Sequence, residues 1–220
     1  AFTGFNFEQI KEYRALFEEA FSDNHLILFG SNTAQESSDG INIFNSLVVV
    51  NNKLNIVYQY NKIKLVPFGE FLPYENILNK FGVKKITEGY GSFSKGSTYD
   101  TFKYDNLNML PLICYEIIFP ELNPNQKNII VNISEDAWFG STIGPSQHFA
   151  KAIFRAIENN VYLVRSANKG FSAFVDNKGV VKKLLKPNER GVIEPVSYTH
   201  LRAHETDSYL VCRLLLEKRD

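Results

Sequence analysis

The sequence predicts an α/β fold in which two central sheets pack together and helices cover them. Short strand-like runs alternate along the chain with segments of helical periodicity, which is typical of layered α/β domains. Two runs, residues 109–113 and 128–133, are apolar enough to be buried on both faces, as strands of a covered sheet are. The 220 residues, 44% hydrophobic and 22% charged, suffice for one such domain.

The N-terminal part predicts a helix followed by strands. Apolar residues recur every three to four positions, which indicates an amphipathic helix over a sheet, and Asp23 and Asn24 follow its last apolar residue; the set is Phe7, Ile10, Tyr13, Leu16, Phe17 and Phe21. Residues 26–29 and 47–50 are predicted strands, and the turn at Asn51-Asn52 joins the second to residues 55–60 as a hairpin.

The C-terminal part predicts one helix and two more strands. Residues 147–159 carry Phe149, Ile153 and Ile157 on one helical face. Residues 161–164 and 171–175 are predicted strands, and the second turns at residues 177–179. The polar clusters that follow the two buried strands should line the functional site.

Charge and cysteine content exclude several classes of function. Lys plus Arg and Asp plus Glu number 24 each, so no global field attracts nucleic acid. Cys114 and Cys212 are the only cysteines, and their spacing fits neither a disulfide scaffold nor a metal site. No run of about 18 apolar residues predicts a membrane span, and the start at Ala1 indicates a piece of a longer protein.

The last 25 residues have the character of a non-native tail. Residues 196–206 resemble a translated sequencing-library adapter, and residues 210–218 match a distal adapter in the same frame. An ordinary C-terminal strand and helix is the alternative. If the tail is non-native, Cys212, His200 and His204 carry no function, and the native protein ends near Pro195.

Cys114 is the candidate nucleophile. It follows a buried strand, so its sulfur would emerge at a sheet edge where a backbone amide can face a developing oxyanion. A small buried hydrophobe is the alternative for an isolated cysteine in this position.

Lys62 and Glu70 bracket a Pro-Gly turn after the strand of residues 55–60. An ammonium near the sulfur would favour the thiolate and stabilise an oxyanion. Taken alone, Lys62 or Lys64 is better explained as a solvated charge at a strand end, and Glu70 as a turn residue.

Two aromatic residues and one histidine follow the other buried strand. Trp138 and Phe139 either wall an apolar acyl pocket or belong to the core. His148 suggests a Cys-His dyad, and it equally suggests a residue that orients a loop.

Taken in order, the motifs resemble the nitrilase-type domain of bacterial apolipoprotein N-acyltransferases. The similarity spans residues 1–195 and rests on Tyr60-Asn61-Lys62, Leu65-Val66-Pro67-Phe68-Gly69-Glu70, Ile113-Cys114-Tyr115-Glu116, Asn132-Ile133-Ser134, Asp136-Ala137-Trp138-Phe139-Gly140, Gly144-Pro145, Gln147-His148 and Arg155-Ala156. Two positions depart from the family pattern: Glu135 stands where Asn is common, and Lys169 stands between Asn168 and Gly170. Both departures bear on contacts at the substrate edge.

The resemblance implies a four-layer α-β-β-α sandwich, incomplete at both ends, over residues 1–195, with residues 196–220 as the tail. It also implies that no metal or organic cofactor takes part. The catalytic positions that the resemblance implies are Cys114 as nucleophile, Lys62 of a Glu-Lys-Cys triad, Glu70, Tyr115 and Glu116. The substrate-binding positions that it implies are Trp138, Phe139, His148 and Asn168. The triad glutamate would precede Ala1, and Glu8, on a helix face, does not replace it. We therefore expect the chain alone to be inactive.

The implied activity is transfer of a fatty acyl group from a membrane phospholipid, through a cysteine thioester, to the N-terminal amine of diacylglyceryl-cysteine in a lipoprotein. The resemblance further implies a catalytic domain on the periplasmic face of the bacterial inner membrane, held there by segments absent from this chain. A soluble amidase or carbamoylase of the same superfamily is the alternative function, and a non-catalytic binding module is a third.

Overall fold

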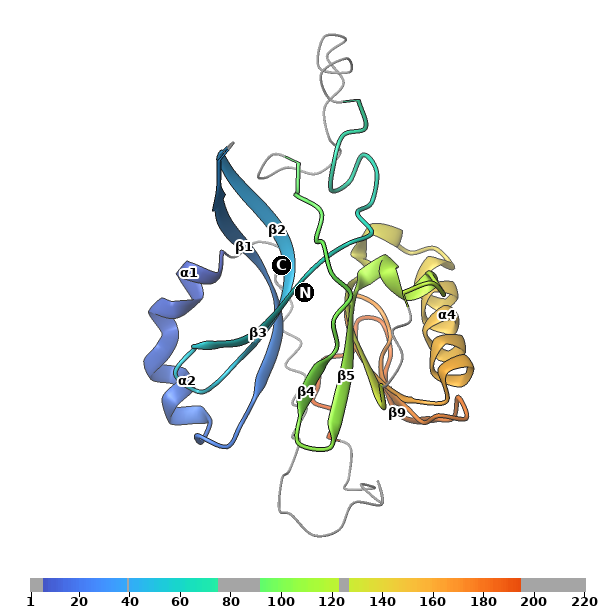
Figure 1. Ribbon diagram of the computed structural model, residues 1–220. Coiled ribbons are helices and arrows are strands. Elements are labelled where there is room, and N and C mark those ends of the chain that lie inside the picture. Colours follow the sequence, from blue (N-terminus) through green and yellow to red (C-terminus); the bar gives the residue numbers. More distant parts are fainter. Residues whose placement is uncertain (1–5, 39, 75–91, 123–126, 195–220) are drawn as a thin grey trace.

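The computed structural model describes residues 6–38, 40–74, 92–122 and 127–194, and the chain folds around two sheets (Figure 1). The smaller sheet is antiparallel, with the order β1 (Ile27–Ser37), β2 (Gly40–Val50), β3 (Ile56–Asn61). The turn between β2 and β3 lies at Asn51, whose side chain accepts hydrogen bonds from the backbone of Lys53 and Asn55. The predicted hairpin is confirmed.

The larger sheet is mixed and has six strands. In spatial order they are β4 (Phe102–Tyr104), β5 (Leu107–Ile113), β6 (Ile129–Glu135), β7 (Tyr162–Asn168), β8 (Ser172–Val175) and β9 (Val181–Leu185). The three central strands β5, β6 and β7 are parallel, and the outer pairs are antiparallel. The carboxyl ends of β5, β6 and β7 therefore meet at one edge.

Helices lie outside both sheets, so the layers run α-β-β-α (Figure 1). On the side of the small sheet are α1 (Phe7–Ile10), η1 (Lys11–Tyr13) and α2 (Arg14–Ala20); beside the large sheet lies α4 (Gly144–Asn159). Two short 3-10 helices, η3 (Cys114–Ile118) and η4 (Asp136–Phe139), follow β5 and β6 directly. The predicted layered α/β fold is confirmed.

Alternation along β2 explains how the layers are held together. Val48 and Val50 pack with Phe7 on the helical side, whereas Leu47 and Val49 face the large sheet, because successive side chains of a strand point to opposite faces. The inter-sheet cluster also contains these fully or nearly buried residues: Tyr60, Ile63, Met109, Ile113, Ile129, Val131, Ile133 and Val164. Burying each large apolar side chain contributes roughly 1.5–3 kcal/mol.

Several boundaries differ from the predicted ones for local reasons. The predicted N-terminal helix is interrupted by the 3-10 turn η1, and α4 begins earlier than predicted, with Pro145 in its first turn, where a missing N–H costs nothing. Strands β4 and β9 were not predicted; β9 is largely exposed and carries two lysines. None of the helices in the described ranges is long and apolar enough to cross a membrane. The predicted non-native tail lies outside the described residues.

Candidate active site

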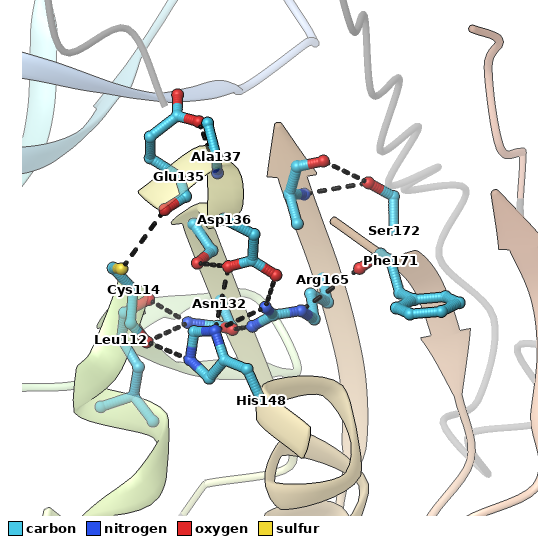
Figure 2. Close-up of polar contacts among 12 residues, drawn as sticks. Leu112, Cys114, Asn132, Glu135, Asp136, Ala137, His148, Arg165, Phe171 and Ser172 are labelled. Carbon is cyan, nitrogen blue, oxygen red and sulfur yellow. Dashed lines mark hydrogen bonds and ion pairs between the residues drawn. The ribbon is translucent and has the colours of Figure 1, made fainter. Parts of the chain in front are cut away.

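Polar residues gather where the three parallel strands end (Figure 2). Cys114 follows β5, Asp136 follows β6, and Asn168 is the last residue of β7. Glu135, the last residue of β6, pairs with Asn168, whose Nδ2 donates to Glu135 Oε2 at 2.8 Å. Parallel register therefore assembles one site from three separate motifs.

The chain turns sharply at Cys114. Its φ is 51°, a left-handed conformation that costs a residue with a side chain about 1–3 kcal/mol unless its surroundings enforce it. Two groups lie on its carbonyl: Asn132 Nδ2 donates at 3.4 Å and His148 Nε2 lies at 3.2 Å. The sulfur is half-buried and lies 3.9 Å from the Glu135 carbonyl oxygen. The thiol thus stands at a sheet edge on an enforced turn.

Lys62 and Glu70 form a buried ion pair. The Lys62 ammonium is 1% exposed and donates to both carboxylate oxygens of Glu70, at 2.8 and 2.7 Å. Glu70 is held in turn by Asn45 Nδ2 and by the backbone N–H of Val66, each at 2.8 Å. The structure therefore brings these two candidate residues together, and both oxygens of the Glu70 carboxylate accept hydrogen bonds.

Glu116 joins the Lys62 segment to the Cys114 turn. Its Oε1 accepts from the backbone N–H of Ile63 at 2.7 Å, from that of Lys64 at 3.0 Å and from the Tyr60 hydroxyl at 3.0 Å. Its Oε2 accepts from the Ile113 N–H at 2.8 Å. Burial raises the pKa of the Glu116 carboxyl above its ordinary value, although the three backbone donors offset part of that effect. One buried carboxyl group thus binds both segments of the site.

A second buried network lies behind Cys114 (Figure 2). Asp136 Oδ1 lies 2.9 Å from His148 Nδ1 and accepts from the Ser134 hydroxyl at 2.6 Å, while Oδ2 accepts from Arg165 Nη2 at 2.8 Å. Arg165 also donates to Asn132 Oδ1 and to the Phe171 carbonyl. Burial alone would raise the pKa of Asp136, but the His148 hydrogen bond and the Arg165 charge outweigh it and lower that pKa.

Gly170 lets the β7–β8 turn approach this network. A Cβ at Gly170 would lie 2.2 Å from Asp136 Oδ2 and 2.7 Å from Asp136 Cβ, closer than atoms can pack. A glycine is therefore required here by space.

The predicted substrate-binding residues divide into exposed and buried ones. Trp138 is 57% exposed and the predicted catalytic residue Tyr115 is 40% exposed, so both border solvent near the site. The Phe139 ring lies 5.6 Å from the ring of His148, which is itself 4% exposed. The sulfur of Cys114 contacts the Glu135 carbonyl, whereas His148 contacts the carbonyl of Cys114. No direct Cys-His pair between side chains is therefore formed by the described contacts.

Sequence reasoning gave no role to Asp136, Asn132 or Arg165. Arg165 offered a signal, because an arginine directly after the apolar run 161–164 needs a buried partner. Among the described residues, no group of three or more His, Cys, Asp or Glu side chains is arranged to hold a metal ion.

The family model and the curated relatives that match this chain agree on its family. The carbon-nitrogen hydrolase family model matches residues 8–209, which extends past Pro195; the non-native tail thus stays a prediction. Curated relatives called apolipoprotein N-acyltransferase include one from Rhizobium leguminosarum bv. trifolii, 38% identical over 182 residues, and one from Brucella melitensis biotype 1, 36% identical over 182 residues. Each match covers 80% of this chain and 34% of the relative, so the chain spans about a third of their length.

Solved structures share the fold. A variant of a Nesterenkonia amidase from the nitrilase superfamily matches with a TM-score of 0.56 at 16% identity, covering 84% of this chain and 66% of that one. A carbon-nitrogen hydrolase from Helicobacter pylori matches with a TM-score of 0.58 at 15% identity, covering 83% and 65%. The α-β-β-α layers, the parallel strands ending at the site and the family match lead to one conclusion. The chain belongs to the carbon-nitrogen hydrolase family and has its nitrilase-like α/β fold.

Proposed function

We propose that this chain is the catalytic domain of an apolipoprotein N-acyltransferase and that Cys114 is its nucleophile. The observation that carries the proposal is the enforced left-handed turn at Cys114, tied through Glu116 to the segment that bears the Lys62–Glu70 pair. Identity of 38% to curated relatives of that name supports the acyl-transfer activity over other reactions of the family. Because the chain spans about a third of those relatives, the activity belongs to a longer protein.

The proposed reaction has two halves. In the first, the Cys114 sulfur attacks the ester carbonyl of a phospholipid; a C–S bond forms, the C–O bond breaks, and the lysophospholipid leaves with a proton. Lys62 and the backbone N–H of Tyr115 stabilise the oxyanion. In the second, the α-amine of a diacylglyceryl-modified N-terminal cysteine attacks the thioester, and the thiol is regenerated. A glutamate in the part of the protein before Ala1 serves as general base.

The other predicted residues support this chemistry in distinct ways. Glu70 holds the Lys62 ammonium, and Glu116 holds the nucleophile turn against the lysine segment. Exposed Trp138 and nearby Phe139 suit the wall of an acyl pocket. Asn168 orients the Glu135 carboxylate at the edge of this pocket.

The proposed location is the periplasmic face of the bacterial inner membrane, where both substrates are available. Phospholipid is the acyl donor and the diacylglyceryl-modified lipoprotein is the acceptor, and membrane attachment is provided by segments outside this chain. The equal numbers of acidic and basic residues fit a protein that binds no nucleic acid.

The test uses the full-length protein in phospholipid vesicles. Intact-protein mass spectrometry should find a fatty acyl adduct that peptide mapping assigns to Cys114 and that Cys114→Ser abolishes. A diacylglyceryl-modified peptide should then remove the adduct and gain its mass. Hydrolysis of simple amides without any lipid adduct would overturn the proposal in favour of a soluble amidase, and the absence of both activities would favour a binding module.

A further inference from the structure

His148 sits between two fixed groups behind the proposed nucleophile. Its Nδ1 lies 2.9 Å from Asp136 Oδ1 and its Nε2 lies 3.2 Å from the carbonyl oxygen of Cys114 (Figure 2). A carbonyl oxygen only accepts hydrogen bonds, so Nε2 must carry the hydrogen of that contact. The described contact of His148 with Cys114 is therefore to the backbone carbonyl.

The ring of His148 is fixed by a chain of buried charges. Asp136, which sets the position of Nδ1, is fully buried and is held by Ser134 and by Arg165, which is also fully buried. Arg165 is anchored in turn to the Asn132 amide and the Phe171 carbonyl. Arg165 Nη2 also lies 3.1 Å from His148 Nδ1, so two buried groups hold this side of the ring and set the direction of its second nitrogen. Here the second nitrogen points at the Cys114 carbonyl.

Holding this carbonyl has a direct consequence for the next N–H group. The peptide unit between Cys114 and Tyr115 is planar, so fixing the direction of its C=O also fixes the direction of the Tyr115 N–H. Tyr115 lies in the first turn of η3, where backbone N–H groups lack an acceptor within the helix. Hydrogen bonds on the carbonyl also polarise the peptide and strengthen its N–H as a donor.

We propose that His148, oriented by Asp136 and Arg165, is a positioning residue that aims the Tyr115 N–H at the oxyanion formed during acyl transfer to Cys114. This inference rests on the proposed function, because it presumes that Cys114 attacks a carbonyl group. It adds a role for a buried network whose described hydrogen-bond contacts with Cys114 are made to the backbone carbonyl. Asn132, which also donates to the Cys114 carbonyl, supplies the second point of attachment.

Two matched substitutions separate the two ends of the histidine. His148→Gln places an amide N–H near the position of Nε2 and keeps the donor to the Cys114 carbonyl. His148→Asn places its amide near Nδ1, keeps the contact with Asp136 and loses the donor to Cys114. His148→Phe retains a ring but has no donor, and it serves as a second donor-free variant should the asparagine variant not fold.

Two reagents separate oxyanion stabilisation from thiol reactivity. With p-nitrophenyl butyrate, the Cys114 sulfur forms a C–S bond to the ester carbonyl carbon, p-nitrophenolate leaves and the thiol proton passes to solvent, through an oxyanion. With iodoacetamide, the sulfur displaces iodide at a saturated carbon, and no oxyanion forms. The reactions of the chain are run in alkaline buffer, in which hydroxide and the buffer base accept the thiol proton in place of a general base from the protein. Peptide-resolved mass spectrometry counts only adducts on Cys114.

We expect His148→Asn and His148→Phe to lower the acylation rate of Cys114 about tenfold or more, and His148→Gln to stay within about threefold of wild type. Alkylation by iodoacetamide should stay within about twofold in every folded variant. Three results would overturn the inference. The first is equal acylation rates of the Gln and Asn variants, and the second is a parallel fall in the acylation and alkylation rates. The third is a wild-type protein that is alkylated but never acylated at Cys114. Failure of the proposed function would appear separately, as the absence of lipid transfer by the full-length protein.

Discussion

Replacing Glu116 should reveal how much of the site's stability passes through one carboxyl group. The side chain is fully buried and accepts four hydrogen bonds: from the N–H groups of Ile63, Lys64 and Ile113 and from the Tyr60 hydroxyl. Glu116→Ala leaves these four donors without their acceptor, and each buried orphan costs about 1–3 kcal/mol. Because the surroundings relax and water enters, the lower end of the range applies to each of the four donors. We therefore expect the free energy of unfolding to fall by about 4 kcal/mol.

Glu116→Gln separates hydrogen bonding from charge. The amide oxygen can keep the three donors on Oε1, but the new NH₂ group then faces the Ile113 N–H, donor against donor. Only one contact is lost, and we expect a cost of about 1–2 kcal/mol. The isolated chain is unfolded in urea at pH 7 and followed by circular dichroism, with Glu121→Ala as an exposed carboxylate control that should leave the midpoint unchanged. The proposal that Glu116 holds the two segments together would be refuted by a loss of less than about 1 kcal/mol in the free energy of unfolding for Glu116→Ala. Equal losses for the Ala and Gln variants would refute it as well.

Three further predictions use the same urea assay or a thermal melt. Glu70→Ala leaves the buried Lys62 ammonium without its carboxylate and should lower the free energy of unfolding by about 3–5 kcal/mol. The double variant Glu70→Leu with Lys62→Met should recover part of this loss. No recovery would contradict a buried ion pair. Gly170→Ala should lower the melting temperature because its Cβ would lie 2.2 Å from Asp136 Oδ2. Gly69→Ala should change the melting temperature little, because its Cβ would make ordinary contacts from 3.5 Å. Equal changes in melting temperature would contradict the close approach at Gly170. Since the folded-state pKa of Asp136 is lowered, its stabilisation is present above the unfolded pKa near 3.8 and is lost as pH falls through the lower folded pKa. Asp136→Asn should therefore be less stable than wild type at pH 7, and the gap should narrow below about pH 4; a constant gap would show that the charge is not involved.

The layered fold was predictable because its signals are local. The run 109–113 is apolar at every position and became the buried end of β5, and residues 55–60 followed a turn signal and became β3. β9 escaped prediction because its exposed lysines carry no burial signal, and it is held by pairing with β8. Backbone pairing with a neighbour can define a strand that its own side chains do not indicate.

The candidate site was predictable only where its residues lie in motifs. Lys62 and Glu70 are eight residues apart on one turn, so their pairing follows from a short stretch of sequence. Arg165 and Asp136 are 29 residues apart and meet because β6 and β7 are parallel neighbours. The register of a parallel sheet is set by tertiary packing, so the sequence motifs included Asp136 without a role and did not point to Arg165 or to the contact between the two residues.

The conformation of Cys114 explains why both kinds of contact are needed. A left-handed cysteine relaxes unless the backbone on each side is held. Before the turn, Glu116 accepts from the Ile113 N–H through a contact only three residues long; at the turn, Asn132 and His148 reach the Cys114 carbonyl from other elements. The local contact alone would leave the carbonyl free to rotate, and the distant contacts alone would leave the preceding strand end free. A motif around the cysteine therefore identifies the nucleophile, while its reactive geometry depends on residues that lie elsewhere in the sequence.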